Sequence, residues 1–153
     1  MRTWFLLIFM LLRGPGWAQS PLEFRLELEK GTCKLGQPIL AHMVLKNSSP
    51  NPLHVNARLL VNGPYPFEHE VVMKVTGPDG LMPFALLMRT GPPIPQHYYL
   101  LRTGRSISNL VDLAHSYAIR KVGVYRIEAA YENRYPKAWV GRLLAPPVEV
   151  RVD

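Results

Sequence analysis

The stretch "VDLAHSYAIRKVGVYRIEAAY" (residues 111–131) decides the fold. Its last part alternates apolar and charged residues, the pattern of a strand with one buried face. Gly123 comes two residues before Tyr125, which is the spacing of a tyrosine corner, where a tyrosine hydroxyl donates back to the preceding crossover. The expected corner consists of Asp112, Tyr117, Gly123 and Tyr125. In it, Asp112 ends the preceding strand and caps the turn, and Tyr117 packs beneath the turn.

The same stretch contains the residue types of a hydrolase triad, Asp112, His115 and Ser116. Triads gather from separated segments and usually place the serine on a sharp turn flanked by glycine. Ser116 directly follows His115 and has no such turn, so we expect no triad and interpret His115 as a bystander on the corner.

Helical periodicity is nearly absent from the chain, and fifteen prolines and eleven glycines separate short segments rich in β-formers. The predicted strands are 22–29, 39–47, 53–61, 70–80, 82–89, 97–101, 106–113, 124–132 and 146–153. This cadence predicts an all-β, immunoglobulin-like antiparallel β-sandwich of eight or nine strands, with a short helical turn near 113–119. A partly closed barrel is the alternative.

The N-terminus has the pattern of a secretory signal peptide, cleaved after about Ala18. Arg2 provides a positive start, an apolar run covers residues 4–12, and small residues stand before the expected cleavage site. The run is shorter than the about 20 residues of a spanning helix, although Arg13 directly after it leaves an uncleaved anchor as the alternative. We expect residues 1–18 to be the signal peptide and 19–153 one sandwich domain, secreted or periplasmic in a bacterium, with no membrane span in the mature chain.

The net charge and the cysteine content exclude several classes of function. The formal net charge is +7, or +5 without Arg2 and Arg13, and the basic residues form no run or stripe, so nucleic-acid binding is not expected. With the single cysteine Cys33, no intramolecular disulfide is possible, and no thiolate activator or further metal ligand stands beside it. Asn47 begins an N-x-S glycosylation sequon, which is informative only in a eukaryotic secretory pathway.

The histidines do not predict a metal site, and we expect no cofactor and no catalytic residue. None of the five has the spacing of a zinc protease motif. His69 stands between Glu68 and Glu70, but alternation along a strand would put both glutamates on one face and His69 on the other. We interpret this segment as a solvated strand edge.

Residues 132–142, "ENRYPKAWVGR", are the best candidate for partner binding. The candidate side chains are Arg134, Tyr135, Lys137, Trp139 and Arg142. Exposed aromatic and arginine side chains on a loop are common in binding hot spots and also suit stacking on sugars. In an immunoglobulin-like layout this loop lies at the same end of the sandwich as residues 47–52. The alternative is that Tyr135 and Trp139 fold back and cover the core.

Residues 24–131 resemble a known domain family through the segments "FEHEVVMKVTGPDGLMPF" and "RTGPPIPQHYYLLRTGRSISNLVDLAHSYAIRKVGVYRI". The shared positions are Phe67-Glu68, Pro78-Asp79-Gly80, Arg89, Pro92-Pro93, Tyr98, Gly104, Val111-Asp112-Leu113, Tyr117 and Gly123-Val124-Tyr125. The chain is similar here to the β-sandwich domain that precedes the catalytic domain of bacterial deuterolysin-like (aspzincin) metallopeptidases, and to related stand-alone secreted domains.

The resemblance implies the fold and an accessory role, because the zinc motif and the catalytic domain of that family are missing. We therefore expect an exported, non-catalytic module that binds a protein or glycan partner through its tip loops. A free-standing protease inhibitor or a folding helper acting on a secreted partner is the alternative.

Overall fold

The computed structural model describes residues 20–63, 65–86 and 89–153, so the predicted signal peptide lies outside the described residues. The described chain is an all-β sandwich with one short α-helix and one 3-10 turn. The strands are β1 (Leu22–Leu28), β2 (Thr32–Cys33), β3 (Leu40–Asn47), β4 (Leu53–Asn56), β5 (Val71–Gly77), β6 (Gly80–Leu81), β7 (Tyr98–Leu101), β8 (Ser106–Asp112), β9 (Gly123–Asn133), β10 (Gly141–Leu144) and β11 (Val148–Val152). The helices are the 3-10 turn η1 (Pro95–His97) and α1 (Leu113–Ser116).

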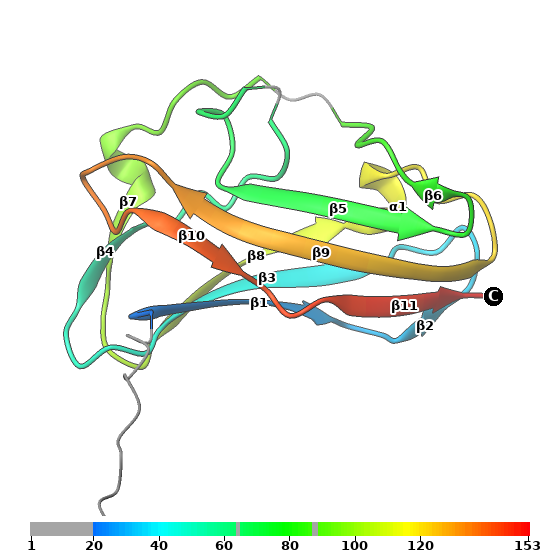
Figure 1. The fold of residues 1–153 in the computed structure, drawn as a ribbon, viewed down its shortest axis with the longest axis horizontal. Coiled ribbons are helices and arrows are strands. Elements are labelled where there is room, and N and C mark those ends of the chain that lie inside the picture. Colours follow the sequence, from blue (N-terminus) through cyan, green and yellow to red (C-terminus); the bar gives the residue numbers. More distant parts are fainter. Residues whose placement is uncertain (1–19, 64, 87–88) are drawn as a thin grey trace, which may run out of the picture.

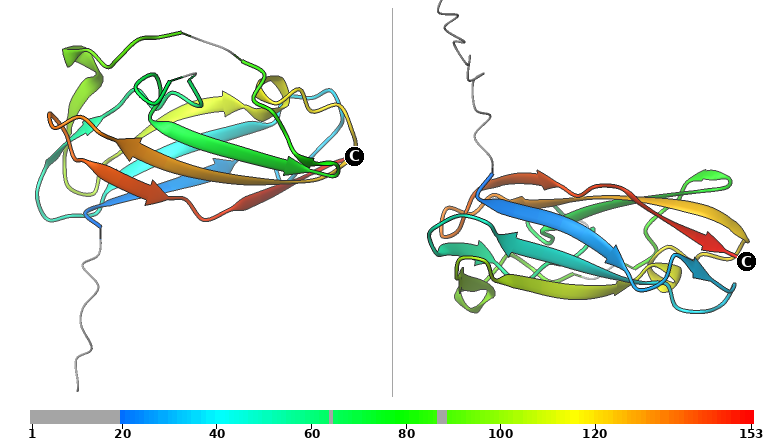
Figure 2. Two further views of the ribbon diagram at one scale, coloured as in Figure 1. Left: turned by 45° about the horizontal axis from the view of Figure 1, so that its top comes forward. Right: turned by 90° about the horizontal axis from the view of Figure 1, so that it is seen from below.

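The strands form two main layers, which lie one behind the other in Figure 1 and are seen separated in the view from below in Figure 2. One sheet has the order β1-β3-β8, and the other has the order β2-β11-β9-β5-β6, with β10 also pairing with β9. If β1, β3, β5, β8, β9 and β11 are taken as strands A, B, C, E, F and G of the immunoglobulin fold, the two sheets have the central orders A-B-E and G-F-C. These are the orders of an immunoglobulin-like sandwich. A separate two-stranded ribbon, β4-β7, closes one end of the sandwich. The predicted fold class is therefore confirmed.

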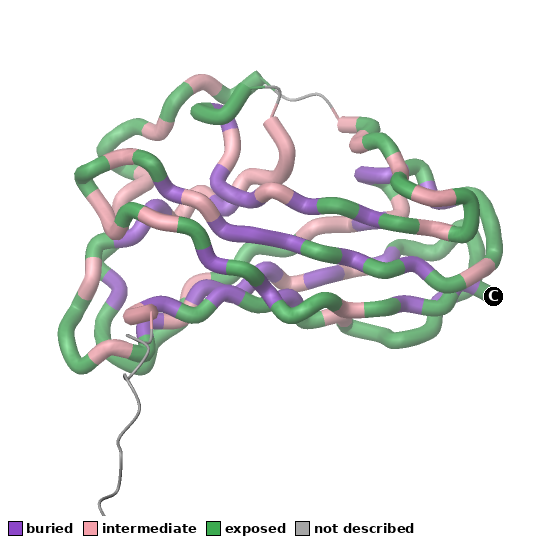
Figure 3. Tube along the Cα trace, in the orientation of Figure 1, coloured by how far each residue is buried: buried purple, intermediate pink, exposed green. Residues whose placement is uncertain are grey.

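Alternation along the strands explains the core. In β1, Leu22, Phe24 and Leu26 point inward and are at most 5% exposed, while the residues between them are exposed. The inward side chains of β3, β5 and β9 are buried to a similar degree, and Figure 3 shows the buried residues gathered on the strands of both layers. A side chain of this size stabilises the fold by about 1.5–3 kcal/mol when fully buried, so packing can hold the sandwich together without a disulfide.

The corner residues lie where β8 crosses to β9. Asp112 is the N-cap of α1 and accepts hydrogen bonds from the backbone of Ala114 and His115. Tyr117 is buried, and its hydroxyl donates to the carbonyl oxygen of Met73 at 2.8 Å. These contacts connect the crossover to the opposite sheet.

Tyr125 closes the corner. Its hydroxyl donates to the carbonyl oxygen of Lys121, four residues upstream, at 2.8 Å. Gly123 has φ = +144°, and a Cβ there would lie 2.4 Å from Cγ of Pro78. Only glycine fits this position without strain, since both the backbone and the space around it exclude a side chain.

Three strand predictions need correction. The segment 53–61 is a strand only over β4, because the backbone turns at Leu59, where φ is +50°. Residues 82–86 form no strand, and the hairpin partner of β5 is the two-residue β6. Conversely, residues 141–144 form β10 and pair with the end of β9, although the first two were assigned to the loop 132–142 and the other two to no strand.

Candidate partner-binding site

The loop between β9 and β10 lies at the end of the sandwich closed by β4 and β7 (Figure 1). It contains four of the five candidate residues, and the fifth, Arg142, lies on β10. The backbone amide of Trp139 donates to the carbonyl oxygen of His54 in β4 at 2.8 Å. Because residues 48–52 lead directly into β4, the two loops lie at the same end, as the strand order requires.

Trp139 turns back toward the core. It is partly buried and packs against the core cluster, and its ring stacks on the buried Tyr131 at a centroid distance of 6.2 Å. A Cβ on Gly141, where φ is +154°, would lie 2.6 Å from the Trp139 ring. The glycine therefore leaves the space that the indole fills.

Asn133 fixes the backbone of the loop around the tryptophan. Its buried amide donates to the carbonyl oxygens of Trp139 at 2.6 Å and Tyr135 at 3.0 Å. Tyr135 itself is half-buried. For Trp139, the structure thus favours cover of the core over a free aromatic ring.

The basic candidate residues, on the loop and on β10, face solvent. Arg134 and Arg142 both contact Glu132, each at 3.1 Å, and both arginine side chains are more than half exposed. Lys137 is exposed and has no ion pair within the described part of the chain. One carboxylate between two arginines leaves this surface positively charged.

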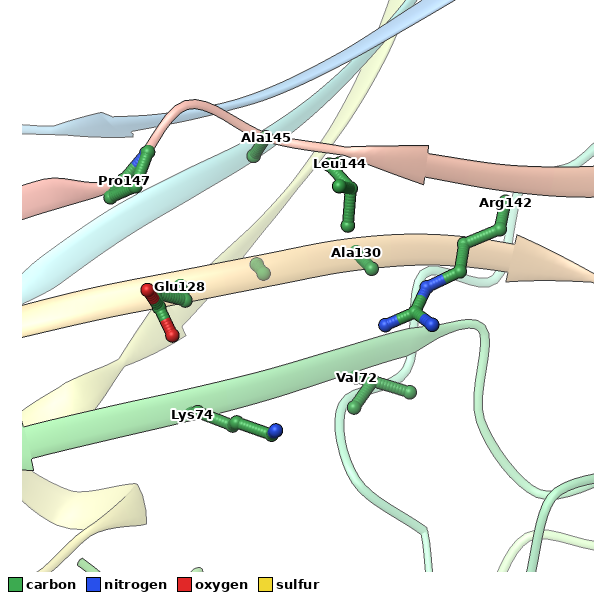
Figure 4. A pocket seen from close by; sticks show the side chains of 9 residues that line it. Val72, Lys74, Glu128, Ala130, Arg142, Leu144, Ala145 and Pro147 are labelled. Atoms are coloured by element: carbon green, nitrogen blue, oxygen red, sulfur yellow. The ribbon is translucent and has the colours of Figure 1, made fainter. Parts of the chain in front are cut away.

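Arg142 connects the loop to a shallow groove on the outer face of the sheet. The groove has a volume of about 330 Å³ and is lined by Val72, Lys74, Glu128, Ala129, Ala130, Arg142, Leu144, Ala145 and Pro147. We call it the outer groove. Figure 4 shows the Arg142 side chain extending across β9 toward Val72 of β5. A second depression, lined in part by Arg134 and Val140, lies on the other side of Arg142.

The floor and wall of the outer groove are apolar. Ala130 points outward from β9 and is only 2% exposed, whereas Leu144 on the neighbouring β10 is 72% exposed. Lys74 and Glu128 provide charges at the rim. An exposed leucine beside two cations suits a ligand that has an apolar group next to an acidic one.

The triad residue types do not form a reaction centre. Asp112 Oδ1 accepts from the backbone amides of Ile39 and Ala114, at 3.1 and 3.0 Å, so this carboxylate oxygen serves the backbone. Ser116 is buried and His115 is exposed. Within residues 20–63, 65–86 and 89–153, no group of three or more His, Cys, Asp or Glu side chains lies close enough together to hold a metal ion.

The interpretation of the "FEHE" segment as a solvated strand edge is wrong. Glu68 and Glu70 are 5% and 1% exposed, and the segment is a turn that precedes β5. Glu70 forms an ion pair with Arg58 at 2.7 Å and also accepts from the side-chain amide of Asn56. One oxygen of Glu68, Oε2, is buried without a hydrogen-bond partner among the described residues. The ion pair between Arg58 and Glu70 could not be predicted from the sequence pattern, because an irregular loop separates the two residues.

Two other sequence features are buried. Cys33 is 6% exposed in β2. Asn47 is 0% exposed, and its amide donates to the carbonyl oxygens of Asn51 and Leu101, at 2.8 and 2.9 Å. The sequon amide is thus occupied in the folded protein.

Burial raises the pKa of the hydroxyls of Tyr117 and Tyr131, although each hydroxyl has a hydrogen-bond partner. Both tyrosines therefore remain neutral donors around physiological pH. They are parts of the core rather than reactive groups.

No family model and no curated protein matches this chain. None of the described helices is long and apolar enough to cross a membrane.

Proposed function

We propose that the protein is an exported, non-catalytic binding module that recognises a partner through the β9–β10 loop and the adjoining outer groove. The observation that carries the proposal is the position of Arg142, which lines both the outer groove and the depression beside Arg134. Together with the exposed Leu144, it forms a continuous surface of mixed apolar and basic character. Arginine beside an exposed apolar side chain is a frequent composition of binding hot spots.

Among protein and glycan partners, the site chemistry favours a protein. Stacking on sugars needs a free aromatic face, and Trp139 places its ring against Tyr131. The outer groove instead offers Leu144, Lys74 and Arg142, which fit an apolar side chain with a carboxylate next to it. The proposed accessory role is supported by the resemblance to the β-sandwich domain of bacterial deuterolysin-like metallopeptidases, and the proposed export by the signal-peptide pattern of residues 1–18.

Paired variants test this function. Arg142→Glu with Leu144→Ser changes the proposed surface, whereas Trp139→Ala removes cover from the core. Wild type and the double variant are immobilised side by side and exposed to secreted proteins and to cell-wall polysaccharides of the source organism. Each captured candidate is then purified, and its affinity for both proteins is measured by calorimetric titration. We expect a protein that binds wild type at least about tenfold more tightly than the double variant, while the melting temperature of that variant stays within a few degrees of wild type.

Arg151→Glu, on the exposed face of β11, is the control for a general charge effect. Equal binding by wild type and the Arg142/Leu144 variant would remove this surface from the function. Binding only to a polysaccharide would favour the glycan alternative.

A further inference from the structure

The three-stranded sheet ends at β8 with an unpaired edge (Figure 2). Within the described residues β8 pairs with β3 alone. The backbone bonds from Asn47 N to Arg105 O and from Leu113 N to Ile39 O show that odd-numbered residues face β3. In an antiparallel ladder the groups between them point the other way. The N–H and C=O groups of Ser106, Ser108 and Leu110 therefore face outward.

One of these groups is satisfied only locally. The amide of Leu110 donates to Oδ1 of Asn109, its own neighbour, at 2.9 Å. A side chain of the same strand thus takes the place of a neighbouring strand. This contact is easily exchanged, because Asn109 is exposed.

The inner face of β8 is incompletely covered. Ile107 and Val111 are partly exposed and Asn109 is exposed, although all three point toward the sandwich interior. Their cross-strand neighbours on β3, Ala41, Met43 and Leu45, are at most 1% exposed. In the immunoglobulin-like order, a fourth strand normally lies beyond this position and covers it.

An apolar groove runs along this edge. It has a volume of about 180 Å³ and is lined by Met43, Leu59, Leu60, Val61, Phe84, Leu86, Asn109, Leu110, Val111 and Ser116. The far wall, residues 84–86, is fixed to the end of α1 by a backbone bond from Ala85 to Ser116 at 2.7 Å. The groove thus combines apolar pockets with a row of outward-facing backbone groups, the two elements that strand addition uses.

Positive charge gathers at the first end of β8. Arg105 directly precedes the strand, Arg102 lies in the same turn, and Lys46 pairs with Ser106 across the ladder. Arg102 and Arg105 are exposed, and the described residues provide no ion pair for any of the three. An occupant with acidic residues at this end would be attracted.

From this edge, groove and charge we infer that β8 binds an extended, acidic-flanked segment of a partner protein as an added β-strand. The outward groups of Ser108 and Leu110 form the ladder, alternate apolar side chains of the segment enter the groove, and its acidic residues approach Arg102 and Arg105. A second copy of the chain fits less well, because joining two β8 edges would bring the far walls of both grooves to the same side of the joined sheet. This surface is separate from the outer groove, so it goes beyond the proposed function.

The probe is a synthetic peptide that alternates valine and threonine over the length of β8 and has paired glutamates at both ends. A second peptide has lysines in place of the glutamates. Fluorescence anisotropy measures the affinity of each, and amide hydrogen exchange by NMR reports the backbone. We expect the glutamate peptide to bind at least about tenfold more tightly than the lysine peptide and to slow exchange at Ser108 and Leu110.

Ser108→Pro removes one outward N–H and leaves the bonds to β3 in place, and Ser108→Ala is the matched control that keeps this N–H. The proline variant should lose at least about tenfold in affinity, and the alanine variant should bind like wild type. Should the proline disturb the fold, Arg102→Glu with Arg105→Glu provides a surface test in which the preference between the two peptides reverses.

Three outcomes would overturn the inference. They are absence of peptide binding to wild type, equal affinity for Ser108→Pro and Ser108→Ala, and slowed exchange confined to residues outside β8. A dimer of the free protein that becomes a monomer in Ser108→Pro, measured by light scattering, would assign the edge to a second copy instead. Each result leaves the Arg142/Leu144 test unaffected, because the variants lie on opposite sheets.

Discussion

The guanidinium of Arg58 and the carboxylate of Glu70 lie 2.7 Å apart, and their side chains are only 6% and 2% exposed. Arg58 also donates to the carbonyl oxygens of Phe67 and Gly91. The pair therefore connects the loop before β5 to the crossover that follows β6. The pair thereby holds together the long loops that cover one side of the sandwich.

Glu70→Ala should destabilise the protein strongly, by about 3–5 kcal/mol, because it leaves the buried Arg58 without a counter-charge. Urea unfolding followed by tryptophan fluorescence measures this free energy. The control is Glu149→Ala, whose partner Arg126 lies 3.7 Å away on the surface. The control should stay within about 0.5 kcal/mol of wild type. Equal effects at the two sites would show that the buried pair does not stabilise the fold.

Tyr125→Phe should lower the free energy of unfolding by about 1 kcal/mol, since it removes the hydrogen bond to Lys121 and little else. Thermal and urea unfolding both check this value. Tyr99→Phe, at a 55% exposed position, is the matched control and should have no measurable effect. An unchanged stability of Tyr125→Phe would mean that water replaces the corner bond without cost.

Gly123→Ala should destabilise by about 1–3 kcal/mol, from an unfavourable positive φ and from contact with the Pro78 ring. Combining it with Pro78→Ala separates the two causes. If steric contact contributes, the double variant loses less than the sum of the single changes, and this coupling is read from a double-mutant cycle. Strict additivity would assign the whole effect to the backbone.

Local patterns predicted the parts of this structure whose causes are local. The spacing of Gly123 and Tyr125 indicated a hydrogen bond to a residue a few positions upstream, and Tyr125 donates to Lys121. Alternation likewise indicated the inward face of β1, because neighbouring residues on a strand point to opposite sides. The all-β class follows from such elements taken together.

Features that depend on distant contacts were not predictable in this way. Whether Trp139 faces solvent is decided by Tyr131 beneath it and by Gly141, which leaves room for the ring. The burial of Glu70 depends on its ion pair with Arg58, which lies in the irregular segment after β4. The open edge of β8 follows from the order of the strands in the sheet. The alternation of residues along a single strand carries no information about that order.

Stability should decrease above about pH 10, because two tyrosines ionise less readily in the folded protein than in the unfolded chain. Burial raises the pKa of Tyr117 and Tyr131 above the ordinary value of 10.0. Above that pH the unfolded chain releases protons that the folded protein retains, so unfolding becomes more favourable. Their contribution is fully present below pH 10 and is lost as the pH rises toward the folded values. Urea unfolding between about pH 8 and 11 should show a falling free energy for wild type and a shallower decline for Tyr117→Phe. An identical slope in both proteins would show that Tyr117 ionises equally in the two states.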